Sequence, residues 1–63
     1  MSLKAQQTNP GHYNIYNDKG VTVGTCKLDE NKMWQLKIDC PIKQVSDTDC
    51  FRNDLFARHG IEL

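Results

Sequence analysis

The chain has 63 residues, of which 38% are hydrophobic and 25% are charged, and its formal net charge is zero because eight basic residues balance eight acidic ones. This length allows one small domain and leaves little room for an enclosed substrate pocket, which usually needs about 300 Å³ or more. A neutral chain disfavours a dedicated nucleic-acid-binding domain, since contacts of Lys and Arg with phosphates supply most of the affinity of such domains.

The residue types also bear on the compartment. No apolar stretch of the sequence approaches the ~20 residues that a membrane span requires. The cysteines are three, an odd number without a Cys-x-x-Cys pair, which is more typical of a reducing compartment than of a disulfide framework. We therefore predict a cytoplasmic protein that makes no contact with membranes.

The beginning of the chain is mostly polar. Residues 1–12 contain the breaker cluster Asn9-Pro10-Gly11, which predicts a flexible N-terminal arm. The remaining residues, 13–63, are predicted to form a single small α/β domain.

Three short strands are predicted to follow this arm, over residues 13–16, 21–28 and 33–40. The first turn, Asn17-Asp18-Lys19-Gly20, suits a type I turn whose final glycine adopts the left-handed conformation. The second turn, residues 29–32, is polar. Together they predict a three-stranded antiparallel β-meander.

The lengths of these turns fix a predicted register for the meander. Ile15 is expected opposite Val23, and Leu28 opposite Met33, which also brings Val23 beside Ile38. In this register the apolar side chains of all three strands fall on one face of the sheet.

One helix is predicted after Pro41, from about Asp47 to Arg58. Ser46 is a favourable N-cap, and Gly60 fits the left-handed residue that follows many helices. The predicted fold class is therefore α+β, with a three-stranded antiparallel β-meander packed against one C-terminal α-helix in two layers (βββα). The predicted core consists of apolar residues from both layers: Tyr13, Ile15, Val21, Val23, Trp34, Leu36, Ile38, Phe51, Leu55 and Phe56.

Catalytic, metal and cofactor sites are not expected. Cys26, Cys40 and Cys50 lie too far apart in the sequence for the ligand pairs of structural zinc sites. Cys50 falls in the first predicted helical turn and His59 at its far end, so the two cannot form a nucleophile–base pair. No glycine-rich phosphate loop is present, and we predict that the protein is not an enzyme.

The sheet face that the predicted helix leaves open indicates a function in binding. We predict a small non-enzymatic protein-interaction module, of the regulator or inhibitor type, that uses this face or a sheet edge and binds a protein partner or a second copy of itself as a homodimer. The predicted partner-binding residues are Tyr16, Cys26, Leu28, Met33, Gln35 and Lys37. The alternative is a small DNA- or RNA-binding domain that presents its three-stranded sheet to nucleic acid through Lys19, Lys27, Lys32 and Lys37.

Overall fold

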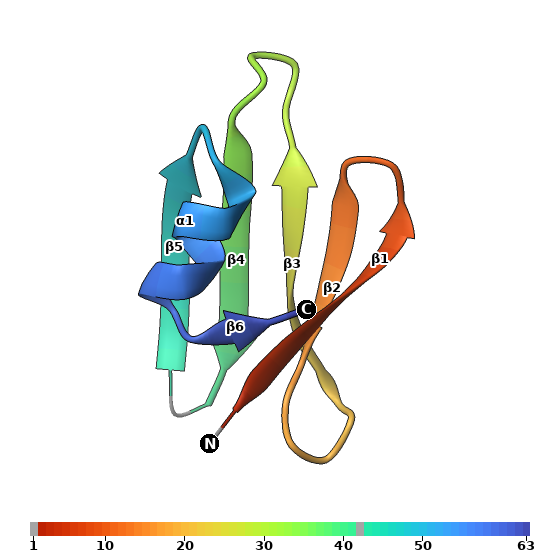
Figure 1. Ribbon diagram of the computed structural model, residues 1–63. Coiled ribbons are helices and arrows are strands. Elements are labelled where there is room, and N and C mark those ends of the chain that lie inside the picture. Colours follow the sequence, from red (N-terminus) through yellow and green to blue (C-terminus); the bar gives the residue numbers. More distant parts are fainter. Residues whose placement is uncertain (1, 42) are drawn as a thin grey trace.

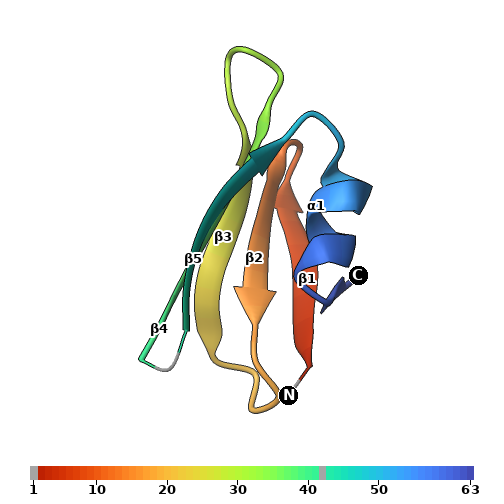
Figure 2. The same cartoon turned by 90° about the vertical axis from the view of Figure 1, so that its left-hand side faces the viewer.

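The computed structural model describes residues 2–41 and 43–63, which form a six-stranded mixed sheet curled into a half-barrel, with one short helix (Figure 1). The strand order is β5-β4-β3-β2-β1-β6, antiparallel throughout except that β6 runs parallel to β1. Figure 2 shows α1 on one side of the sheet, which we call the concave face; the opposite side is the convex face. In chain order the elements are β1 (Leu3–Asn9), β2 (His12–Tyr16), β3 (Thr22–Leu28), β4 (Trp34–Cys40), β5 (Lys43–Asp49), α1 (Arg52–Arg58) and β6 (Ile61–Glu62).

The prediction of a three-stranded meander with one helix is therefore wrong, because three further strands complete the sheet. β1 comes from the segment predicted as a flexible arm. Pro10 and Gly11 form the turn between Asn9 and His12, which are paired, and Gly11 has a positive φ of 75°. The breaker residues thus belong to a hairpin, in which Ala5 is buried opposite Ile15.

The start of the predicted helix is also wrong. Ser46, Asp47 and Asp49 lie in β5, and α1 begins only at Arg52, with Phe51 as an N-cap that makes no side-chain hydrogen bond. The carboxylates that suggested a helix start instead receive hydrogen bonds from the end of α1. The C-terminal prediction is confirmed, because the helix ends at Arg58 and Gly60 has a φ of 66°.

The first predicted turn is confirmed, but the register beyond it is shifted. The Gly20 N–H donates to the Asn17 carbonyl oxygen at 3.0 Å, and Gly20 has a φ of 78°. A β-bulge follows, since Tyr16 is paired with Thr22 whereas Ile15 is paired with Gly24. The extra residue is Val23, and the shift reverses which side chains of β3 face the core.

The second turn keeps β3 in this reversed orientation. Leu28 is paired with Trp34 rather than with Met33, because the Asp29 N–H donates to the Met33 carbonyl at 2.9 Å and Lys32 takes the left-handed conformation, with a φ of 63°. Gly24 consequently lies opposite Ile38.

The core fills the space between the concave face and α1. Cys26, Ile15, Leu36 and Leu55 are fully buried, whereas Val21, predicted to be in the core, is exposed. Phe51, also predicted there, is 64% exposed. The buried residues come from the sheet, the helix and β6: Ala5, Tyr13, Ile15, Cys26, Leu36, Ile38, Leu55, Phe56 and Ile61.

Candidate functional site

The six predicted partner-binding residues do not form one surface. Tyr16, Gln35 and Lys37 lie on the convex face, since they are paired with Lys4, Thr48 and Ser46 and alternate with buried neighbours. Cys26 is completely buried, because the bulge in β3 turns it toward the core. The semi-apolar patch predicted from the sequence is therefore absent from the described structure, since the remaining two residues, Leu28 and Met33, lie on the concave side and in a turn.

The convex face is polar. Cross-strand rows such as Gln6–Asn14–Thr25–Lys37–Ser46 run across β1 to β5 without a large apolar side chain. Of the lysines predicted to contact nucleic acid, Lys27 and Lys37 lie on this face, where they are diagonal neighbours. Lys19 and Lys32 lie in the two turns of β3, which are at opposite ends of the sheet (Figure 1).

β5 is the strand at one edge of the sheet. It is paired with β4 in an unbroken register from Trp34–Asp49 to Cys40–Lys43. Within the described part of the chain, β4 is the one strand that pairs with it. Every second residue of such a strand therefore directs its N–H and C=O groups away from the sheet.

The Thr48 N–H shows which residues these are, because it donates to Oδ1 of Asp47 at 2.8 Å rather than to β4. Alternation along an antiparallel strand then directs the backbone groups of Ser46 and Gln44 outward as well. The Thr48 carbonyl accepts a hydrogen bond from Nη2 of Arg58 at 3.3 Å. The end of β5 nearest the helix is thus closed by side chains, whereas Gln44 and Ser46 leave their stretch of the edge open.

Charged side chains join β5 to α1. Oδ2 of Asp47 lies 2.9 Å from Nη2 of Arg58 and 2.9 Å from Nε2 of His59, and Oδ2 of Asp49 lies 2.5 Å from Nη1 of Arg58. Hydrogen bonds from His59 and then Arg58 lower the pKa of Asp47 to about 2. The Phe51 N–H and Arg58 hold the pKa of Asp49 below its usual range. These contacts fix the position of the β5 edge relative to the helix.

The other edge of the sheet is less suited to pairing. β6 covers only Leu3 and Lys4 of β1, but the uncovered part of β1 contains a register shift between Gln7 and Asn9. Such irregularities twist a strand away from a straight partner. The regular open edge of the molecule is therefore that of β5.

An aromatic cluster lies beneath the start of α1, and its contacts were not predicted from the sequence. The Tyr13 ring packs edge-on against Trp34 and Phe56, with ring centres 5.8 Å apart in both pairs. The Arg52 guanidinium lies 5.2 Å from the centre of the Tyr13 ring and donates a hydrogen bond to the tyrosine hydroxyl. Aromatic burial and this cation–π contact anchor the helix, so we assign the cluster a structural role.

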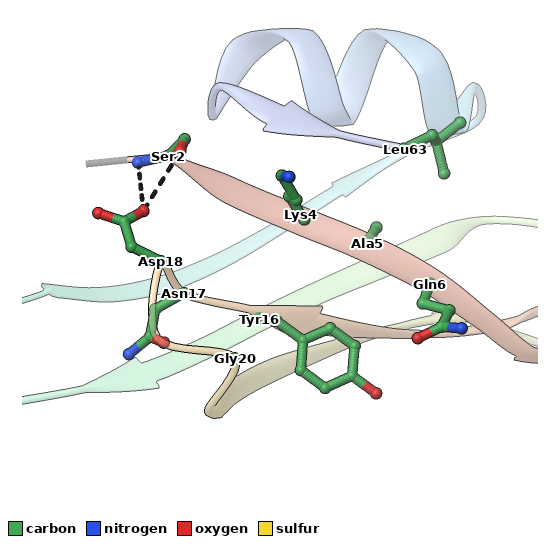
Figure 3. Close-up of a pocket in the computed structure, with 9 residues that line it drawn as sticks. All are labelled: Ser2, Lys4, Ala5, Gln6, Tyr16, Asn17, Asp18, Gly20 and Leu63. Carbon is green, nitrogen blue, oxygen red and sulfur yellow. Dashed lines mark hydrogen bonds between the residues drawn. The ribbon is translucent and has the colours of Figure 1, made fainter.

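An open depression of about 540 Å³ lies where the first residues of the chain meet the β2–β3 turn (Figure 3). Ser2 donates through its N–H and its hydroxyl to Oδ1 of Asp18, at 2.9 and 3.2 Å. The carboxylate that lines the depression is therefore already hydrogen-bonded within the chain. Lys4 and Tyr16 also line it, but neither is buried. The depression lacks the enclosed apolar walls of a small-molecule site.

Among residues 2–41 and 43–63, no three His, Cys, Asp or Glu side chains are grouped so that they could hold a metal ion. Over the same part of the chain, no helix is long and apolar enough to cross a bilayer.

Comparison of the chain with protein-family models, curated proteins and solved structures finds no match. Functional interpretation therefore depends on the geometry of the molecule itself.

Proposed function

We propose that this protein is a non-enzymatic protein-interaction module, of the regulator or inhibitor type, that binds an extended segment by strand addition at β5. The observation that carries the proposal is the outward direction of the backbone groups of Gln44 and Ser46 in a regular edge strand. In this binding mode, main-chain hydrogen bonds supply affinity and the alternating side chains supply specificity.

The side chains of β5 suit this role. Gln44 and Ser46 are small or flexible polar residues on the convex face, so an added strand meets two uncharged side chains, with the charged Asp39 and Lys37 one strand farther in. Val45 lies between them on the concave face, half-buried against the core, and offers an apolar contact to one side chain of an added strand. The surface thus combines two polar positions with one apolar position.

Two proline substitutions test the proposal. Ser46→Pro removes an N–H that points away from the sheet, which edge strands tolerate, whereas Val45→Pro removes an N–H bonded to β4 and is expected to destabilise the fold. Linear peptides selected from a display library on the wild-type protein are expected to lose binding to Ser46→Pro, while its circular dichroism spectrum stays unchanged. Peptide binding that survives in folded Ser46→Pro would refute strand addition at β5.

A second candidate function, nucleic-acid binding, is favoured by the distribution of charge. Lys4, Lys27 and Lys37 lie on the convex face, and their antiparallel cross-strand partners Tyr16, Gln35, Thr25 and Ser46 are uncharged. Asp29 bonds to Gln35 and Asp39 is paired with Gln44, while Asp47 and Asp49 point toward the helix. The nucleic-acid-binding alternative predicted from the sequence likewise used a sheet surface.

Retention on single-stranded DNA at ~50 mM salt tests this candidate, because electrostatic attraction to phosphates is strongest at low salt. Lys27→Ala and Lys37→Ala are expected to weaken retention more than Lys19→Ala and Lys32→Ala, which serve as matched controls in the turns. Absence of retention by the wild-type protein would eliminate nucleic-acid binding.

A further inference from the structure

The open part of the β5 edge is short. Three residues of β5 direct their backbone N–H and C=O groups outward, namely Gln44, Ser46 and Thr48. The N–H of Thr48 is bonded to Asp47 and its C=O to Arg58. Among the described residues, Gln44 and Ser46 are therefore the two whose outward backbone groups have no side-chain partner. A strand that pairs here must therefore form its hydrogen bonds with the backbone groups of Gln44 and Ser46 and must not extend to Thr48, near the helix.

We propose that the occupant of this edge is a second copy of the same chain, whose β5 runs antiparallel to the first with Gln44 opposite the partner's Ser46. This inference rests on the proposed function, since it specifies which extended segment is added. The twofold axis passes between Val45 and the partner's Val45, and both sheets join into one continuous sheet.

The backbone geometry selects this register. Two opposed residues that both point outward exchange both of their hydrogen bonds, so the pairs of Gln44 with Ser46 use all of the open groups in both copies. A twofold axis at Ser46 would set Gln44 opposite the partner's Thr48, whose carbonyl is already bonded to Arg58. An axis at Gln44 would set Ser46 opposite a residue that precedes β5.

The side chains are also complementary in this register. On the concave face, Gly24, Ile38 and Val45 form a cross-strand row, which the partner's Val45 extends with another apolar side chain. On the convex face, Ser46 is paired with Lys37 and Gln44 with Asp39, so each basic row continues into an acidic row of the other copy.

The surface at this position is hollowed, which gives a second line of support. A depression of about 400 Å³ is lined by the three β5 residues of the proposed seam, Gln44, Val45 and Ser46, and by their β4 neighbours Lys37, Ile38 and Asp39. The three residues of the proposed seam thus border a concavity.

Disulfide trapping tests the register in a Cys40→Ser/Cys50→Ser background, in which Cys26 is buried. Opposed residues that are not hydrogen-bonded have Cα atoms about 4.5 Å apart, within the range of a disulfide, so Val45→Cys is expected to give a covalent dimer on mild oxidation. Ser46→Cys is the matched control: it is more exposed, but its twofold copy lies about 7 Å away or farther. Equal or faster cross-linking of Ser46→Cys would overturn the register.

Sedimentation equilibrium separates this inference from the proposed function. The wild-type chain is expected to show a concentration-dependent monomer–dimer equilibrium that Ser46→Pro abolishes. A wild-type protein that stays monomeric at millimolar concentration would overturn the dimer, yet peptides that bind it and not Ser46→Pro would still support strand addition. A dimer that persists in folded Ser46→Pro would overturn the proposed dimer, and the peptide assay would then decide the proposed function independently.

Discussion

The helix α1 is held to the sheet in two different ways. On one side, Leu55 and Phe56 insert into the core, where Leu55 has no exposed surface. On the other side, Arg58 bonds to Asp47 and Asp49 at the β5 edge, where its own side chain is 46% exposed. Buried packing therefore supplies most of the stability of this contact, whereas the exposed ion pairs mainly fix the position of the β5 edge.

The interior depends most sharply on Gly24, where β3 and β4 approach closely. A Cβ at this position would lie 2.2 Å from the Lys37 carbonyl oxygen and 2.9 Å from Cα of Ile38, so the Gly24→Ala variant must separate the two strands. We expect a loss of about 3 kcal/mol or more, a large part of the ~3–9 kcal/mol typical of a chain of this size.

Urea denaturation of Gly24→Ala measures this loss, and Thr25→Ala, on the convex face of the same strand, is the control. A Gly24→Ala variant as stable as Thr25→Ala would show that the strands do not meet at this distance.

The next largest effect contrasts two residues of the helical segment that the sequence placed together in the core. Leu55→Ala removes a fully buried side chain and is expected to cost about 2–5 kcal/mol. Phe51→Ala removes a larger side chain that is 64% exposed, and a change within about 0.5 kcal/mol is expected. Thermal unfolding of the two variants makes the comparison; equal losses would place Phe51 inside after all.

The two turns of β3 give a smaller, stabilising prediction. Both have the same hydrogen bonds: Asn17 and Asp29 each accept through Oδ1 from the backbone N–H groups two and four residues later. The left-handed position is glycine in one turn, Gly20, and lysine in the other, Lys32. Because a residue with a Cβ is strained there by roughly 1–2 kcal/mol, Lys32→Gly is expected to stabilise the protein by about 1 kcal/mol.

Gly20→Ala is the reciprocal variant, and the added Cβ meets no atom within 4 Å, so its effect isolates backbone strain. Chemical denaturation is expected to show opposite signs for the two variants. A destabilised Lys32→Gly would mean that the lysine side chain contributes more than the strain costs.

The local features that depend on single residues were predictable from the sequence. Gly20 indicated its turn and Gly60 its helix end, because a positive φ leaves a strong preference for glycine. The periodicity of residues 34–38 likewise placed Leu36 and Ile38 in the core.

The larger errors arose where a residue type suits two structures. Ser46 and Asp47 favour a helix N-terminus, yet they form an edge strand because Arg58 and His59 supply partners for Asp47. Nothing in the alternation of residues 21–28 indicated the bulge at Val23, and that one extra residue moved Cys26 from the predicted binding face into the core. The predicted surface therefore differs from the observed one through the register of β3 rather than through composition.

The smallest expected effect is the acid sensitivity of the contact between β5 and α1. The pKa of Asp47 falls from 3.8 to about 2 in the folded protein, chiefly through hydrogen bonds from His59 and Arg58. Below pH 4 the unfolded chain takes up a proton at this residue before the folded protein does, so the stability that Asp47 contributes is complete above pH 4 and is lost as the pH falls toward 2. The side chain is 33% exposed, and water and salt therefore limit the size of the effect.

Asp47→Asn is expected to flatten the decline in melting temperature between pH 4 and pH 2 relative to wild type, and Asp54→Asn, an equal charge change in the first turn of α1, is the matched control. If both variants decline as the wild type does, the carboxylate of Asp47 does not link β5 to the helix. The closure of Thr48, and with it the restriction of the open edge to Gln44 and Ser46, would then lose its basis, because Asp47 both holds Arg58 and accepts from the Thr48 N–H.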